Sequence, residues 1–245
     1  MAVASQENPG LLKRAEKEAV RILEQCSGKG WTSPEIANLI LLEVQRLSRV
    51  FDPYRDGKAL EMKEARTAFE RVESCVGPDL HSRVLVAALG NTLDFFRRPE
   101  EAFSRVVRQT GRRPLFFRDE TNRLDKALGR GVELVLYLTD NAGEIYFDLP
   151  LWKYLAEKVE RMVLVVKGGP ALNDLTRTEL RGAGLGHHFA EVADTGTPGA
   201  GIDWKRTSTE FRRLVREADV IVSKGMANFE TVFPRDLEAS CFFLF

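Results

Sequence analysis

The chain has 245 residues, 44% of them hydrophobic, which is enough for the core of one large domain or two small ones. Its 36 lysines and arginines balance its 36 aspartates and glutamates, so no net charge favours a nucleic acid or a membrane as partner. No apolar run reaches the roughly 18 residues of a membrane span. The three cysteines form no Cys-x-x-Cys pair, which predicts a reducing compartment, the cytoplasm, and no zinc or disulfide framework.

The first half of the chain has the spacing of helices, with charged and apolar side chains alternating at helical intervals. The helices predicted from this spacing cover residues 11–25, 58–75, 79–97, 99–109 and 119–128. Thr32 and Glu35 form a capping box, which predicts the start of one more helix.

The predicted helix over residues 79–97 is interrupted by Gly90, which is followed by Asn91 and Asp94. A glycine costs about 1 kcal/mol in a helix interior, so we expect a close approach of another element or a functional role. The alternative is that the helix bends or ends here. If the role is functional, Asn91 and Asp94 line the same pocket as the strand ends described next.

From Val132 onward, short apolar runs alternate with helical stretches, which is the pattern of β–α–β units in an α/β fold. The predicted strands are the run that starts at Val132 and residues 162–166, 191–193, 219–223 and 239–245. We therefore place a boundary between a helical N-terminal subdomain, residues 1–130, and a Rossmann-like α/β domain, residues 131–245. Because the last apolar run stops at Phe245, we expect this domain to be truncated at its C-terminal end.

Four of these strands end in polar or glycine residues. The residues that follow them are Asp140, Asn141, Gly143 and Glu144; Lys167, Gly168 and then Asp174; Asp194 and Gly196; and Lys224 and Gly225. In a parallel sheet these ends lie along one edge, where α/β sheets bind ligands. Four such ends are harder to attribute to chance than one, so we favour a functional site. For Asp140 or Asn141 alone, the alternative is a cap on the next helix.

The side chains at these ends suit a metal ion and an anion. Asp140, Asn141 and Asp174 offer oxygen ligands for a divalent ion such as Mg²⁺ or Mn²⁺, and Lys167 or Lys224 offers positive charge to an anion beside it. Phosphate esters need this combination, because the ion neutralises developing charge and activates a water. The sequence therefore predicts phosphate chemistry at this edge.

Four motifs follow one another in this half of the chain: Asp-Asn-Ala-Gly-Glu-Ile-x-Phe-Asp, Lys-Gly-Gly-Pro-x-x-Asn-Asp, Asp-x-Gly-x-x-x-x-Gly and Lys-Gly-x-x-Asn-Phe-Glu-Thr. Together they resemble the metal-dependent damage-control phosphatases, the acidic-residue-methyltransferase-like family that was once a domain of unknown function. The earlier Asp-Pro-Tyr at residues 52–54 and Gly-Asn-x-x-Asp at residues 90–94 match its prokaryotic branch. The resemblance thus covers most of the chain.

The resemblance implies a helical N-terminal part packed on a three-layer α/β/α domain with a mostly parallel sheet. It also implies hydrolysis of phosphate monoesters of small metabolites, such as sugar phosphates or damaged phosphometabolites, with Mn, Mg, Co or Ni as cofactor. The expected catalytic residues and metal ligands are Asp140, Asn141 and Asp174. The expected substrate-binding residues are Asn91, Asp94, Glu144, Lys167, Asp194, Lys224, Asn228 and Glu230.

Two alternatives remain open for the function. Asp140 is a covalent nucleophile in one of them, through an aspartyl-phosphate with the metal assisting. In the other, the chain is a non-catalytic module that binds a nucleotide or metabolite in the same crevice. Members of the family continue past the last strand to a lysine that contacts the substrate phosphate, so we expect a chain ending at Phe245 to bind metal but to lose most activity. The sequence does not specify an oligomeric state.

Overall fold

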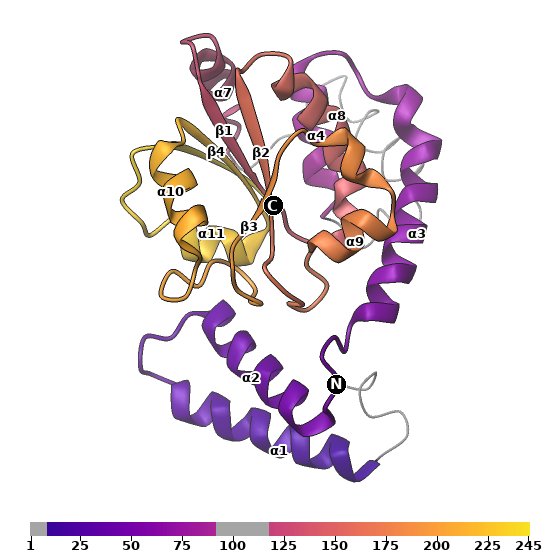
Figure 1. Ribbon diagram of the computed structural model, residues 1–245, viewed down its shortest axis with the longest axis vertical. Helices are drawn as coiled ribbons and strands as arrows, with labels where there is room; N and C mark the ends of the chain where they lie inside the picture. The colour runs from indigo at the N-terminus through magenta and orange to yellow at the C-terminus, as the bar shows by residue number, and fades with distance from the viewer. Residues whose placement is uncertain (1–8, 92–117) are drawn as a thin grey trace.

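The computed structural model describes residues 9–91 and 118–245, which form helices on both faces of a central sheet (Figure 1). All five predicted strands form: β1 (Leu134–Leu138), β2 (Arg161–Val166), β3 (Val192–Asp194), β4 (Val220–Lys224) and β5 (Ser240–Leu244). Within the described residues every strand runs parallel to its neighbours, in the order β3-β2-β1-β4-β5. The predicted α/β class with a parallel sheet is confirmed.

The strand order reverses at β1. After β1 the chain adds β2 and β3 on one side, and it then returns to place β4 and β5 on the other. The connections that leave the carboxyl ends of β1 and β4 go to opposite faces of the sheet, which leaves a crevice between them. The turns after Leu138 and after Lys224 therefore flank the place where an open α/β sheet binds a ligand.

Helices precede the strands and connect them. Those before β1 are α1 (Pro9–Cys26), α2 (Ser33–Ser48), α3 (Arg55–Val72), α4 (Leu80–Leu89) and α7 (Thr121–Leu128). Those after it are α8 (Ile145–Ala156), α9 (Arg177–Gly182), α10 (Thr209–Glu217) and α11 (Met226–Val232), with 3₁₀ turns η2 (Glu73–Cys75), η3 (Ala142–Glu144) and η4 (Leu185–His188). The capping box of Thr32 and Glu35 is confirmed at the start of α2. The helix predicted over residues 99–109 lies outside the described residues.

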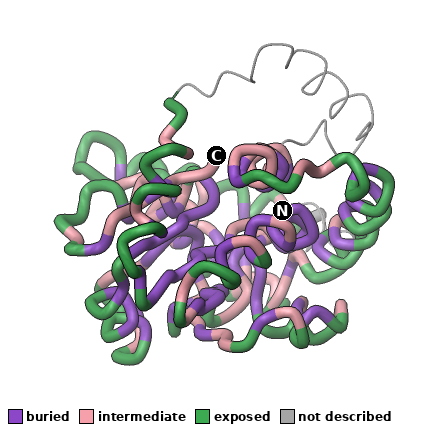
Figure 2. Tube along the Cα trace, turned by 90° about the horizontal axis from the view of Figure 1, so that it is seen from above, coloured by how far each residue is buried: buried purple, intermediate pink, exposed green. Residues whose placement is uncertain are grey.

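The side chains of β1 alternate between two hydrophobic clusters, one on each face of the sheet. Val135 and Tyr137 pack with residues of α3, α4 and α8, whereas Leu134 and Leu136 pack with residues of α10 and α11. Figure 2 shows buried chain through the middle of the molecule and exposed chain around it. Helices cover both faces, so the expected three-layer α/β/α arrangement is confirmed. Each helix in the described ranges is too short or too polar to span a membrane.

The predicted helix over residues 79–97 is shorter than expected, because α4 ends at Leu89 and Gly90 takes the C-cap position. A Cβ on Gly90 would lie 2.9 Å from the Cβ of Phe147 in α8, closer than real side chains approach. Both explanations of this glycine therefore hold, since the helix ends here and the glycine lets α4 approach α8. The part of the prediction beyond residue 91 lies outside the described residues.

Helix α2 is fixed to the carboxyl edge of the sheet by one buried amide. The α1–α2 hairpin lies beyond that edge (Figure 1), and Asn38 of α2 points back toward it. Asn38 Nδ2 donates to the carbonyl oxygen of Ala200 over 3.1 Å, and the N–H of Ala200 donates to Asn38 Oδ1 over 2.8 Å. Since Ala200 belongs to the glycine-rich turn after β3, the hairpin packs beside the loops that carry the predicted site.

The domain boundary placed at residue 131 stays a prediction. Helices before and after this position share one hydrophobic cluster. Within it, the rings of Phe69 in α3 and Phe147 in α8 meet edge to face with centroids 5.4 Å apart. The helical part and the sheet are therefore packed directly on each other.

Candidate functional site

The turn after β1 places Asp140 and Asn141 at the reversal of the strand order. Asn141 precedes the 3₁₀ turn η3 with extended backbone, yet its side chain makes no capping hydrogen bond to that turn. Its Nδ2 instead donates to Glu144 Oε1 over 2.6 Å. The alternative that Asn141 merely caps the next helix is therefore wrong.

Asp140 is held against the turn after β4. Gly225 opens that turn with a φ of +80°, in the left-handed region that favours glycine. A Cβ added to Gly225 would overlap the carboxylate of Asp140. Gly225 is therefore needed for its backbone conformation and for the space that Asp140 occupies.

Backbone hydrogen bonds bring Asp174 to the same place. The loop after β2 pairs with the turn after β1, because the N–H of Leu175 donates to the carbonyl of Asp140 over 2.8 Å and the N–H of Ala142 to that of Asn173 over 2.8 Å. These bonds form a bridge between Asn141 and Asp174. We call Asp140, Asn141 and Asp174 the strand-end cluster; the structure assembles the three residues that the sequence predicted as metal ligands.

Around the carboxylates of the strand-end cluster, negative charges outnumber positive ones. Asp174 is 4% exposed, and its Oδ2 has no hydrogen-bond partner in the described part of the chain, with Lys167 Nζ 3.5 Å away. Burial raises the pKa of Asp174 in spite of that lysine. Burial, together with the negative charges of Glu144 and Asp174, raises the pKa of Asp140 well above its usual value. A cation placed here would relieve this excess of negative charge.

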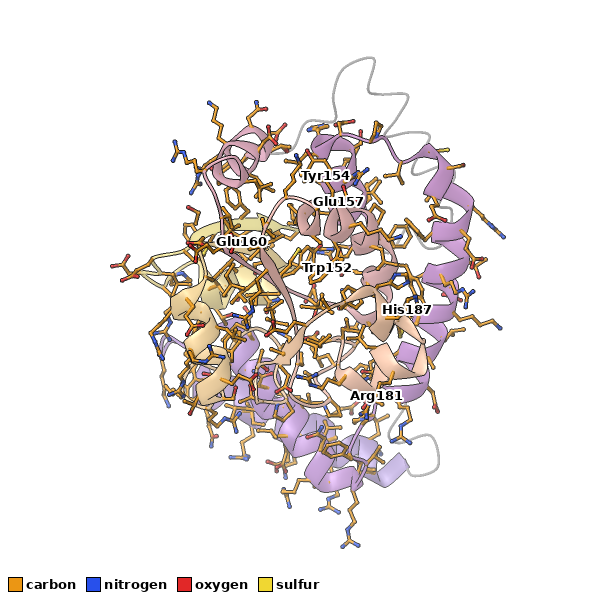
Figure 3. All side chains as sticks on the ribbon, turned by 45° about the horizontal axis from the view of Figure 1, so that its top comes forward. Trp152, Tyr154, Glu157, Glu160, Arg181 and His187 are labelled. Atoms are coloured by element: carbon orange, nitrogen blue, oxygen red, sulfur yellow. The ribbon has the colours of Figure 1, made fainter. Side chains whose placement is uncertain are left out.

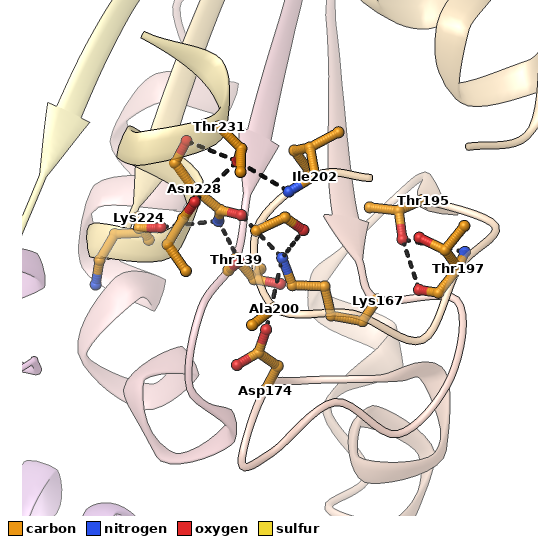
Figure 4. Close-up of polar contacts among 12 residues, drawn as sticks. Thr139, Lys167, Asp174, Thr195, Thr197, Ala200, Ile202, Lys224, Asn228 and Thr231 are labelled. Atoms are coloured by element: carbon orange, nitrogen blue, oxygen red, sulfur yellow. Dashed lines mark hydrogen bonds and ion pairs between the residues drawn. The ribbon is translucent and has the colours of Figure 1, made fainter. Parts of the chain in front are cut away.

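Lys167 and Asn228, both predicted to bind substrate, form a buried hydrogen-bonded pair beside the cluster (Figure 4). Lys167 Nζ donates to Asn228 Oδ1 over 2.8 Å and to the carbonyl of Gly201 over 2.9 Å. Asn228 Nδ2 in turn donates to the carbonyls of Thr139 and Lys224. The pair therefore ties together the loops after β1, β2, β3 and β4.

Lys224 lies beneath the cluster in a second group, the lysine network, made of Tyr137, Glu144, Asp148 and Lys224. Its Nζ donates to Glu144 Oε2 over 2.7 Å, to Asp148 Oδ1 over 2.8 Å and to the carbonyl of Ala87 over 2.7 Å. An ammonium has three protons, and all are used here. The contacts predicted from Lys224 and Glu144 to substrate stay predictions; both side chains are at most 1% exposed.

Burial sets the charge balance of the lysine network. It raises the pKa of Asp148 to about 6, although Lys224 opposes the shift. Burial alone would lower the pKa of Lys224, but the carboxylates of Asp148 and Glu144 outweigh it and raise that pKa. Tyr137, whose hydroxyl donates to Asp148 Oδ1 over 2.8 Å, completes the network.

Glu61, which reaches the site from helix α3, was not among the predicted site residues. Its Oε1 accepts the N–H of Gly143 over 3.1 Å, and its Oε2 accepts Asn173 Nδ2 over 3.1 Å. Burial raises the pKa of this carboxyl. Glu61 therefore links the two loops that carry the strand-end cluster, but in a helix rich in charge its sequence context is that of a solvated glutamate.

The other predicted substrate-binding residues lie around the site or outside the described residues. Asp194, at the end of β3, accepts a hydrogen bond from Arg177 Nε over 2.8 Å. Asn91, directly after α4, and Glu230, in α11, are partly exposed. Asp94 lies outside the described residues. Substrate contacts from all four remain predictions.

Two other features of the surface are separate from the strand-end cluster. His187, in the turn η4, and Arg181, in α9, are both exposed (Figure 3). A cavity of about 700 Å³ is lined mainly by α7, α11 and β5, with Phe229 and Phe243 among its walls. No residue of the cluster lines that cavity.

Comparisons with known proteins agree on one family. The sequence signature described as Damage-control phosphatase ARMT1-like domain matches residues 3–245. A damage-control phosphatase of Archaeoglobus fulgidus is 32% identical over 242 residues, which cover 96% of this chain and 82% of that protein. Damage-control phosphatase PH1575 of Pyrococcus horikoshii is 34% identical over 203 residues, 81% of this chain and 69% of the relative. The crystal structure of PH1575, described as a DUF89 family protein, aligns with a TM-score of 0.82 and 29% identity over 98% of this chain and 84% of that one.

Proposed function

The chain belongs to the ARMT1-like damage-control phosphatase family, and from this premise we propose that it hydrolyses phosphate monoesters of small, damaged metabolites with the help of a divalent metal ion. The metal proposal rests on the buried carboxylate of Asp174, whose Oδ2 accepts no hydrogen bond among the described residues. It is paired with the ammonium of Lys167 at 3.5 Å, and that ammonium already donates to Asn228 and to the carbonyl of Gly201. A buried carboxylate oxygen that lacks a hydrogen bond costs stability, and one shared ammonium at 3.5 Å compensates that cost only in part.

The donors of the strand-end cluster fit a hard divalent ion. They are two carboxylates and one amide, and Mg²⁺ and Mn²⁺ prefer oxygen ligands of these kinds. In the described residues, five carboxylates lie around the ammonium groups of Lys167 and Lys224: Asp140, Asp174, Glu61, Glu144 and Asp148. A third ammonium, that of Lys58, also acts on Asp174 but is paired with two further carboxylates, Asp52 and Glu179. Within residues 9–91 and 118–245, no three His, Cys, Asp or Glu side chains lie close enough together to bind one metal ion. The proposed site therefore needs the amide of Asn141 as a ligand.

The residues of the chain would prepare this site in advance. When bound, the ion supplies positive charge for the phosphoryl oxygens and lowers the pKa of water. Lys167 fixes Asp174 from one side, and Gly225 leaves room for Asp140 on the other. Burial and the nearby carboxylates raise the pKa of Asp140, so a cation and a proton would compete for its carboxyl group.

Phosphate release tests this function and separates it from its alternatives. Metal-stripped protein is assayed on a panel of sugar phosphates with Mn²⁺, Co²⁺, Ni²⁺ or Mg²⁺ added back. We expect release that requires a metal and is lost in Asp174→Asn. Release of no phosphate from any substrate, with substrate still bound, would favour the non-catalytic module. A phosphorylated protein trapped by acid, and absent in Asp140→Asn, would favour the aspartyl-phosphate route.

The setting of this activity is also a proposal. A small phosphorylated metabolite is the partner that a metal and phosphate site implies. Cys26, Cys75 and Cys241 are free thiols, in keeping with the cytoplasmic location predicted from their spacing.

A further inference from the structure

An amide ligand has two ends, and only one of them can bind a cation. The Oδ1 of an asparagine is an acceptor and can ligate a metal, whereas its Nδ2 carries two protons and repels one. The two ends have nearly the same shape, so packing alone does not choose between them. If Asn141 is a ligand, some neighbour has to fix its orientation.

Glu144 is that neighbour. Its Oε1 lies 2.6 Å from Asn141 Nδ2, and its Oε2 accepts a hydrogen bond from Lys224 over 2.7 Å. A carboxylate is an acceptor only, so it pairs with the NH₂ end of the amide and repels the oxygen end. Asn141 Oδ1 is therefore turned away from Glu144.

Glu144 divides its two oxygens between Lys224 and Asn141. It is 1% exposed, and both of its oxygens are occupied by partners inside the protein. We infer that Glu144 is a positioning residue, which orients the amide of Asn141 so that Oδ1 is presented to a divalent cation. This inference rests on the proposed function, because it concerns the metal site of that activity.

Asp148 offers a matched control for Glu144. It is also a buried carboxylate, and it also accepts from Lys224, over 2.8 Å. Its other side-chain partner is the hydroxyl of Tyr137 rather than Asn141. Glu144→Gln and Asp148→Asn thus each remove one negative charge beside the same lysine, but only the first replaces the acceptor that Asn141 faces.

The test is the affinity for Mn²⁺, measured by calorimetry on the full chain, with thermal melting to show that each variant folds. Because an outer-shell partner of a metal ligand is typically worth about 10 to 100-fold in affinity, we expect Glu144→Gln to weaken binding by that factor. Asp148→Asn removes the same charge but leaves the contact with Asn141, so it should weaken binding clearly less than Glu144→Gln does. Equal weakening in both variants would overturn the inference, since Glu144 would then act through its charge alone.

A second substitution tests the orientation directly. In the double variant Asn141→Asp with Glu144→Gln, the new carboxylate has two equivalent oxygens, and the new glutamine amide can donate to one of them. We expect this double variant to regain affinity relative to Glu144→Gln, whereas no recovery would overturn the inference.

If Glu144→Gln does not fold, the Mn²⁺ affinity of the single variant Asn141→Asp tests the inference. It sets two acceptors against each other at the 2.6 Å contact, so affinity should fall although a charge is added. A rise would contradict the role given to Glu144. If the wild type binds no Mn²⁺, the proposed function fails. If the wild type binds Mn²⁺ and Glu144→Gln binds it equally well, the orienting role of Glu144 fails but the proposed function does not.

Discussion

The side chains of the strand-end cluster are held by residues of other elements more than by their own loops. Asp140 lies against Gly225 in the turn after β4, and Asp174 faces Lys167. Glu61 contributes from a helix far away in the sequence, with separations of 82 and 112 residues to its two partners. A single substitution outside the cluster can therefore disturb the ligands.

Gly225→Ala should damage the site more than its backbone alone explains. Gly131 has nearly the same φ, +81° against +80°, but open space where a Cβ would lie. Both substitutions place alanine at a positive φ, which costs about 1 to 3 kcal/mol. Only Gly225→Ala also displaces the Asp140 carboxylate, so we expect a larger loss of thermal stability and a loss of Mn²⁺ affinity. If the two variants melt and bind alike, Gly225 does not shape the site.

At the scale of elements, strands and turns were predictable from the sequence, and long-range packing was not. The strands follow from short apolar runs bounded by turn residues, and their polar ends follow from the parallel sheet. Asn38 and Glu61 were missed because an amide and a carboxylate in a helix usually face water. Lys167 and Lys224 were predicted to lie beside an anion, and both are buried. Acceptors inside the protein bind two of the ammonium protons of Lys167 and all three of Lys224.

The α1–α2 hairpin should depend on Asn38. Asn38→Ala removes both hydrogen bonds to Ala200 and leaves the buried N–H of Ala200 without its partner, which costs about 1 to 3 kcal/mol. Asn122→Ala is the control, because Asn122 is exposed on α7 and should change stability by less than about 0.5 kcal/mol. Denaturant unfolding measures both. Equal effects would mean that the amide does not secure the hairpin.

Helices α3 and α9 are joined by an ion pair that should make stability depend on pH. Lys58 Nζ lies 2.8 Å from Glu179 Oε1, and Lys58 is 1% exposed. Burial alone would raise the pKa of Glu179, but hydrogen bonds from Lys58 and Thr176 outweigh it and lower that pKa below its ordinary 4.5.

The lowered pKa of Glu179 fixes the sign of this dependence. The folded state binds the proton less readily than the unfolded state, so the stabilisation is present above pH 4.5 and is lost as the pH falls through the lower folded value. Glu179→Gln should therefore flatten the fall in unfolding free energy below pH 4.5, measured by urea unfolding at several pH values. A slope as steep as that of the wild type would show that Glu179 does not carry it.

At the scale of the whole molecule, the topology of the sheet explains why the predicted site residues lie at one place. The strand order reverses at β1, the loops of β1, β2 and β4 meet there, and α3 adds Glu61 from the helical part. Membership of the damage-control phosphatase family gives this arrangement its chemistry, and the buried carboxylates give it a reason to hold a cation. We propose that the strand-end cluster holds the divalent ion on which phosphate hydrolysis depends.

The most direct measurement is a Mn²⁺ titration of metal-stripped protein, in which binding and phosphate release are followed in the same samples for the wild type and for Asp174→Asn. We predict no release without metal, a rise in release that follows the bound fraction, and a weakening of both in Asp174→Asn, which removes a charged ligand with little change in shape. Release that persists after chelation, or binding by Asp174→Asn with the affinity of the wild type, would contradict the account.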